Sequence, residues 1–159
     1  MTPEQLKQII TFNLAAMKTG SEIAAAATAE IQHEARNPQL KAALDQGIET
    51  AQQWAARIDR ALAEMGGVAA PVNHAMQAHY EVDKRLRGFA TDDAARDLGI
   101  IGSGQRALHY WMAFFGTLRT YAAHAGLRQL EQDMQASLDE AKRADEQHTQ
   151  LTEQLLGTR

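Results

Sequence analysis

The chain contains no cysteine, and aromatic residues make up only 6% of its 159 positions. Without cysteine the protein has no disulfide, no thiolate metal ligand and no cysteine nucleophile. It also lacks the run of about 20 apolar residues that a membrane-spanning helix requires, and a basic stripe of the kind that binds nucleic acid. The first residues lack the charged and apolar segments of a signal peptide. We therefore expect a cytoplasmic protein that binds neither nucleic acid nor a membrane.

Alanine dominates the residues that are present. Hydrophobic residues form 45% of the sequence, which is enough for a core, and charged residues of both signs are interspersed to give a net charge of −4. An alanine-rich composition with only three prolines favours helices over strands, and no run of alternating β-branched residues predicts a sheet. The length fits one domain. The sequence therefore predicts a single all-α domain over residues 1–159.

Local start and stop signals divide the chain into five helices. Thr2-Pro3-Glu4 places a capping hydroxyl, a proline and an acid in the order of a helix start. Asn37-Pro38 ends the first helix and caps the second, while Gly66-Gly67 and Gly126 are typical of helix ends. We predict helices over residues 3–35, 38–65, 71–86, 93–125 and 127–155, the third opened by Pro71 and the fourth capped by Thr91-Asp92-Asp93.

The four long helices carry apolar stripes. In the second and fourth helices, apolar or small residues recur every three to four positions, for example at Trp54 and Ile58 and at Trp111 and Phe115. Two long antiparallel pairs joined by a short crossover helix predict a ferritin-like four-helix bundle. An up-down bundle with one added helix has the same order of helices, so it stays open as an alternative.

Segments of three helices carry a family pattern. The fourth helix reads Leu108-His109-Tyr110-Trp111-Met112-Ala113-Phe114-Phe115-Gly116-Thr117-Leu118, and the fifth reads Leu138-Asp139-Glu140-Ala141-Lys142-Arg143-Ala144-Asp145. Gly126-Leu127-Arg128 lies between them, and the second helix contains Arg57-Ile58-Asp59. These segments resemble the YciE/YciF family of ferritin-like proteins, with patterns Glu-His-Tyr-Glu-Ile-Ala-x-Tyr-Gly-Thr-Leu and Leu-Glu-Glu-Glu-Lys-x-x-Asp. The resemblance implies a ferritin-like fold, a dimer and a role in bacterial stress responses.

The resemblance also locates the family's metal ligands in this chain. A ferritin-type di-metal site needs about four carboxylates and two imidazoles that point into the bundle. The matching positions here are Gly47, Thr50, Leu108, Trp111 and Ala141, and leucine, tryptophan and alanine offer no ligand atom for iron or manganese. Bulky side chains opposite small ones fill space as a core does. We therefore predict an apolar plug in place of the site, with no metal, no cofactor and no catalytic residue.

A metal site with relocated ligands for iron or manganese is the alternative. Its candidate residues are Glu22, Glu30, His33, Glu49, Glu140, Asp145 and His148. Two of the candidate pairs, Glu30 with His33 and Asp145 with His148, have the spacing of three that puts both side chains on one helical face. Such pairs also arise by chance among 6 histidines and 20 acids, so we favour solvated or hydrogen-bonded roles. We likewise expect His74 and His79 on the surface and His109 in a structural hydrogen bond.

Three functions remain as hypotheses. The favoured one is a non-catalytic, stress-associated structural or interaction protein that acts as a homodimer, or in a hetero-oligomer with an intact family member. Its first helix carries an alanine run, Ala24 to Ala27 with Ala29, that permits close helix approach and predicts a subunit interface. The second is a metal-binding oxidase or metal store with the relocated ligands. The third is a bundle whose interior accepts a small apolar molecule, as helix bundles commonly do.

Overall fold

The computed structural model describes residues 1–67, 69 and 71–157. Its helices are α1 (Pro3–Glu34), α2 (Pro38–Glu64), α3 (His74–Arg87), α4 (Asp93–His124) and α5 (Arg128–Leu156). No strand occurs among these described residues. The predicted all-α class is confirmed, and the long helices begin and end within a few residues of the predicted bounds.

The predicted caps explain why the long helices start where they do. The Thr2 hydroxyl accepts a hydrogen bond from the Gln5 backbone amide, and the Gln5 side-chain oxygen accepts one from the Thr2 backbone amide. The two bonds satisfy two backbone donors that a helix start leaves free. The Asn37 side chain accepts from the amides of Gln39 and Leu40. Asp92, within the predicted Thr91-Asp92-Asp93 signal, caps α4 through the amide of Ala95.

The third helix starts later than Pro71 suggests. It begins at His74, because the Asn73 side chain accepts the Met76 amide at 2.9 Å and so acts as the cap. The Asn73 amide nitrogen also donates to the Ala16 carbonyl and to the Tyr110 hydroxyl. This one residue therefore fixes the start of α3 against both α1 and α4.

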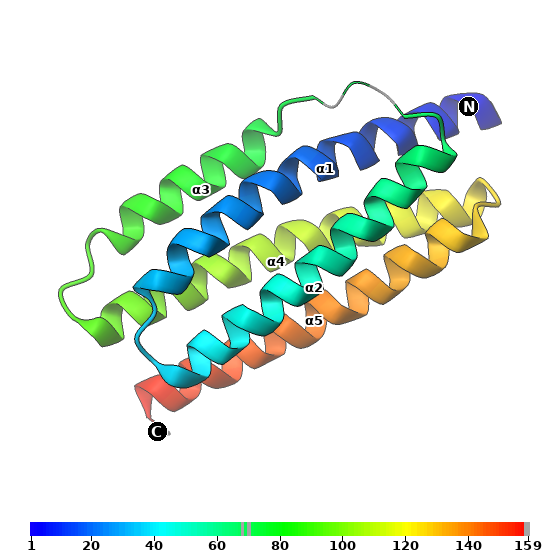
Figure 1. Ribbon diagram of the computed structural model, residues 1–159. Helices are drawn as coiled ribbons and strands as arrows, with labels where there is room; N and C mark the ends of the chain where they lie inside the picture. The colour runs from blue at the N-terminus through cyan, green and yellow to red at the C-terminus, as the bar shows by residue number, and fades with distance from the viewer. Residues whose placement is uncertain (68, 70, 158–159) are drawn as a thin grey trace.

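The chain direction identifies the type of bundle. Helix α3 runs opposite to α2, and α2 and α4 both start at the end of the molecule that holds the C-terminus (Figure 1). Helix α1 contacts α2 and α4, and α5 contacts the same two helices, while α3 lies outside against α1 and α4. A long crossover between two antiparallel pairs is the ferritin-like connectivity. The up-down alternative is thus replaced by the ferritin-like bundle.

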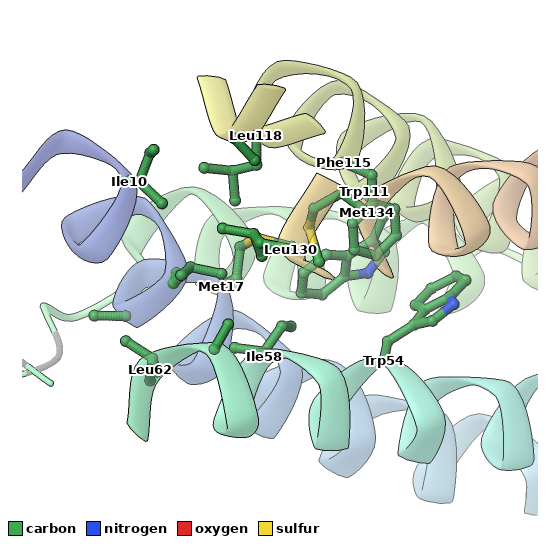
Figure 2. Packing of buried hydrophobic residues seen from close by; sticks show 14 of the residues in the cluster. Ile10, Met17, Trp54, Ile58, Leu62, Trp111, Phe115, Leu118, Leu130 and Met134 are labelled. Atoms are coloured by element: carbon green, nitrogen blue, oxygen red, sulfur yellow. The ribbon is translucent and has the colours of Figure 1, made fainter. Parts of the chain in front are cut away.

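The main core fills one half of the bundle. Trp54 of α2 lies opposite Trp111 and Phe115 of α4 (Figure 2). The Trp54 ring meets the Phe115 ring edge to face at 5.0 Å between centroids, and Trp111 stacks on Phe115 at 5.9 Å, both favourable geometries for aromatic pairs. Toward the N-terminal end of α1, aliphatic side chains and methionines continue the core, including Ile10, Met17 and Met134.

A second, smaller cluster closes the other end of the bundle. It contains Leu40 and Ala43 of α2, Ile100 and Ile101 of α4, and Leu151 of α5. Beside it the buried carboxylate of Asp97 accepts backbone hydrogen bonds from the loop between α1 and α2. Of the positions to which the family's ligands map, Trp111 and Ala141 belong to the main cluster and Leu108 packs against it. Within the described residues, no helix combines the length and apolar character that crossing a bilayer requires.

Candidate functional site

The five positions of the predicted plug lie around the middle of the bundle, at different depths. Trp111 and Ala141 are buried, Thr50 and Leu108 are half-buried, and Gly47 is exposed. No heavy atom lies within 4 Å of the place where a Cβ on Gly47 would stand. The apolar side chains of α4 and α5 therefore occupy the ligand positions, but none of them reaches the space next to Gly47 of α2.

A cavity of about 590 Å³ opens where the plug was expected. We call it the central cavity. Its walls come from α1, α2, α4 and α5, and they include Gly47, Thr50, Leu108 and Trp111. The predicted apolar side chains Trp111, Ala141 and Leu108 pack in the main core. The hollow remains beside them because alanine and glycine face it from all four helices, as at Ala25, Gly47, Gly104 and Ala144. Side chains this small leave a gap between helices spaced by larger neighbours.

Glu140 is the family-type carboxylate that survives beside the cavity, and protein donors already bind it. Arg57 contacts it with two nitrogens, Nη1–Oε2 at 2.6 Å and Nη2–Oε1 at 2.9 Å, and the Trp54 indole donates to Oε2 at 2.7 Å. Burial opposes ionisation of Glu140, but the hydrogen bonds from Arg57 and Trp54 and the Arg57 charge outweigh it and lower the Glu140 pKa below 4.5. A metal ion would have to displace these donors.

The pair near the end of α1 faces α3. Glu30 accepts a hydrogen bond from the Tyr80 hydroxyl and lies 3.0 Å from Lys84 Nζ, both on α3. The Tyr80 bond, followed by that of Lys84, lowers the Glu30 pKa. His33 is exposed. Glu34, the neighbouring acid, pairs with Arg87 at 3.2 Å, so the acids here form ion pairs with α3.

The pair near the end of α5 also separates. Asp145 Oδ2 lies 3.3 Å from Nε2 of His109, whose side chain is largely exposed. The buried His148 ring points elsewhere: its Nδ1 lies 2.7 Å from the Ala144 carbonyl oxygen, and its Nε2 packs over Gly104. Glu30 and His33 face other surroundings, so the structure does not bring the two pairs together.

The remaining candidates are on the surface. Glu22 and Glu49 are both exposed. Across the part of the chain that the structure describes, no three histidine or acidic side chains are grouped to hold a metal ion. The arrangement at the centre of the bundle is therefore one ion pair next to an apolar cavity. Such a cavity can enclose a molecule.

A buried polar cluster on α3 was not predicted as such. Asp83 is 1% exposed, accepts from Arg106 of α4 at 3.1 Å from Nε, and lies 2.8 Å from His79 Nε2. His79, expected on the surface, is thus half-buried, whereas His74 is exposed as expected. The signal was the spacing of four between His79 and Asp83, but the sequence does not indicate that Arg106 approaches from another helix.

The fold and the site can be compared with known proteins. The stress protein YciF of E. coli has a solved structure that matches with a TM-score of 0.87 and 22% identity, covering 97% of this chain and 98% of that one. YcfI of Rhodopseudomonas palustris, described as a candidate structural protein, matches with a TM-score of 0.84 and 22% identity over 94% of each chain. No curated protein matches.

These matches confirm the ferritin-like bundle and the resemblance to YciF that the fourth and fifth helices indicated. At this level of identity the two structures establish the fold alone. A family model described as "Domain of unknown function (DUF892)" matches residues 7–159. Because that match covers nearly the whole sequence, the chain is a member of the DUF892 family.

Proposed function

We propose that this chain is a non-catalytic ferritin-like bundle protein that serves a stress-associated, structural role in the cytoplasm by association with other subunits. The observation that carries the proposal is the state of Glu140. This carboxylate is neutralised by Arg57 and hydrogen-bonded by Trp54, and its neighbour Ala141 has no ligand atom. The centre of the bundle is thus built to be stable without a metal ion.

The relatives support the stress-associated part of the proposal. The chain resembles the E. coli stress protein YciF along nearly its full length. A second similar structure, that of YcfI, is described in structural terms and not by a reaction. We transfer to this chain only the general role of a stress-associated protein with a structural function.

The surface supports the association. Val82, Leu86 and Phe89 follow each other at spacings of four and three on and just beyond α3, and their exposed fractions are 54%, 49% and 81%. Val82 and Leu86 share one side of α3 at a spacing of four, and exposed apolar side chains that gather in a patch mark an interaction surface. We propose a second copy of this chain as the partner. The alanine run of α1, the interface first expected, is partly used as a wall of the central cavity at Ala24, Ala25 and Ala29.

Metal analysis of protein purified from cells grown with added iron and manganese tests the non-catalytic part. The expected result is much less than one metal ion per chain. Stoichiometric metal that is lost in Glu30→Ala or Asp145→Ala variants would support the metal-store alternative and overturn the proposal.

Sedimentation velocity tests the association. We expect a dimer for the wild type and a monomer for Phe89→Ser. Phe12→Ser is the matched control, because Phe12 is also an exposed phenylalanine but lies on α1, and it should stay dimeric. A wild type that is monomeric alone and dimeric only with an intact family member would replace the homodimer by the hetero-oligomer.

A further inference from the structure

The central cavity has the size and the walls of a site for an organic molecule. Its volume of about 590 Å³ falls within the range of about 300–1,000 Å³ that small-molecule sites occupy. Along α5 its lining extends from Glu140 to His148, a span of about 12 Å at the helical rise of 1.5 Å per residue. The space is therefore elongated along the bundle axis.

The two ends of the cavity differ in chemistry. At one end lie Trp54 and Trp111, whose ring centroids are 6.3 Å apart at an angle of 52°. Toward the other end the lining combines small and aliphatic side chains with polar ones such as Thr50 and Gln147, until it reaches His148 beside Gly104. An apolar molecule that lies along the cavity can thus contact aromatic rings with one end and an imidazole with the other.

His148 holds a hydrogen-bonding atom ready at its end of the cavity. The residue is 7% exposed, and its Nδ1 lies 2.7 Å from the Ala144 carbonyl oxygen. A carbonyl accepts only, so Nδ1 carries the proton and Nε2 of the neutral ring has a free lone pair. Nε2 has no hydrogen-bond partner among the described residues. Gly104 makes room for it, because a Cβ there would lie 2.9 Å from Nε2.

The charges around the cavity favour a neutral occupant. Glu140 is compensated by Arg57, and the other charged lining residues, Glu22 and Arg143, are exposed and of opposite sign. Since Arg143 is exposed to solvent, its charge is screened, and an ionised group on the ligand would lose more hydration than this countercharge returns. A hydroxyl can donate to Nε2 without that cost.

We propose that the central cavity binds an elongated, neutral, apolar molecule with a terminal hydroxyl, which donates a hydrogen bond to Nε2 of His148 while the apolar body packs against Trp54 and Trp111. This site is separate from the association proposed above, and either can fail without the other. Its occupant is held by shape and by one directional bond, so the bundle can take up an apolar phenol or alcohol and shield it from water.

Three matched probes test the proposal on the intact protein: 4-phenylphenol, biphenyl and biphenyl-4-carboxylate. Both tryptophans of the chain line the cavity, so intrinsic fluorescence reports occupancy directly. We expect 4-phenylphenol to bind about tenfold more tightly than biphenyl, the ratio that one hydrogen bond of about 1–1.5 kcal/mol gives. We expect the carboxylate to bind most weakly. Absence of binding by all three, or tightest binding by the carboxylate, overturns the proposal.

Variants then identify the residue responsible. His148→Phe keeps a ring but removes the acceptor, and His148→Leu is the second variant in case the larger ring disturbs folding, which thermal unfolding will reveal. Both variants should retain the affinity for biphenyl and should bind 4-phenylphenol with about the same affinity as biphenyl. His124→Phe, at the exposed end of α4, should keep the full preference. Ala51→Phe, which fills the cavity, should abolish binding of every probe. A phenol preference that survives in both His148 variants refutes the assignment.

Discussion

The Trp54 indole of α2 donates a hydrogen bond to the Glu140 carboxylate of α5, with 2.7 Å between Nε1 and Oε2. The same oxygen lies 2.6 Å from Arg57 Nη1, so one carboxylate joins two residues of α2 to α5. Glu140→Gln removes the charge and one acceptor while it keeps the shape. We predict a loss of about 2 kcal/mol of unfolding free energy at pH 7, the range for hydrogen bonds to charged groups, measured by urea unfolding. The exposed neighbour Glu146 provides the control, since Glu146→Gln should change stability by less than about 0.5 kcal/mol.

The same pair sets a pH dependence with a definite sign. The native-state pKa of Glu140 is lower than its ordinary value of 4.5, since the bonds from Arg57 and Trp54 and the Arg57 charge outweigh the burial that would raise it. The stabilisation is therefore complete above pH 4.5 and is lost as the pH falls through the lower native value. We predict that wild type and Glu140→Gln differ fully at pH 7 and converge below the native pKa. A stability difference that stays constant down to pH 3 would contradict this linkage.

Gly20 allows α1 to approach two other parts of the molecule. A Cβ at this position would lie 2.7 Å from the Asn73 side-chain nitrogen and 3.4 Å from the Trp111 ring. Asn73 is held by the Ala16 carbonyl and the Tyr110 hydroxyl, so it cannot move without losing those bonds. We predict that Gly20→Ala costs about 1–2 kcal/mol despite its better helix propensity.

Gly116 is the matched control for that substitution. It lies inside α4, and a Cβ there would have no neighbour within 4 Å. Gly116→Ala should therefore stabilise the protein by about 0.5–1 kcal/mol through propensity alone. Thermal unfolding of the two variants should shift in opposite directions, and a gain for Gly20→Ala would show that Asn73 has room to adjust.

The helix bounds were predictable because their signals are local. Thr2, Asn37 and Asp92 each accept a hydrogen bond from a backbone amide no more than three residues later. The sequence next to each cap is therefore enough to predict where the helix starts. Asn73 was missed because Pro71, two residues earlier, is itself a frequent helix-start residue. The bundle type was less accessible, since the direction of the crossover depends on how α3 docks and not on any one segment.

The candidate site was harder to predict than the fold. The sequence indicates which ligand types are missing at Leu108, Trp111 and Ala141, but it does not give the distance between facing helices. The sequence pattern predicts an alanine such as Ala144 to be a core residue, whether or not a side chain from a facing helix packs against it. The bond between Trp54 and Glu140 likewise joins residues 86 positions apart, so no spacing rule detects it.

Asp97 secures the turn between α1 and α2 from a distant helix. Its carboxylate, 3% exposed, accepts the Arg36 amide at 2.8 Å and the Asn37 amide at 2.7 Å. Asp97→Ala removes both acceptors, and we predict a loss of about 2–3 kcal/mol. Asp97→Asn keeps one acceptor and should cost about half as much. Urea unfolding of the pair checks the order, and equal losses would mean that water replaces the carboxylate at one of the two amides.

Docking of α3 depends on polar contacts. Its buried residues are Met76, Asp83 and Arg87, so one apolar side chain contributes core burial. Arg106 of α4 and His79 contact the Asp83 carboxylate, and this contact ties α3 to the bundle. We predict that Asp83→Asn and Arg106→Gln each destabilise the protein, and that together they cost about 2 kcal/mol less than the sum of the two, as coupled neighbours do.

Hydrogen exchange separates this prediction from a general loss of stability. If the contact of Asp83 with Arg106 holds α3 in place, Asp83→Asn will speed amide exchange over residues 74–87 more than in α5, because α3 has little apolar burial to keep it docked. Glu81, an exposed acid on the same helix, supplies the control: Glu81→Gln should leave exchange in α3 near the wild-type rate. Uniformly faster exchange through all helices of Asp83→Asn would mean that α3 unfolds only with the whole bundle.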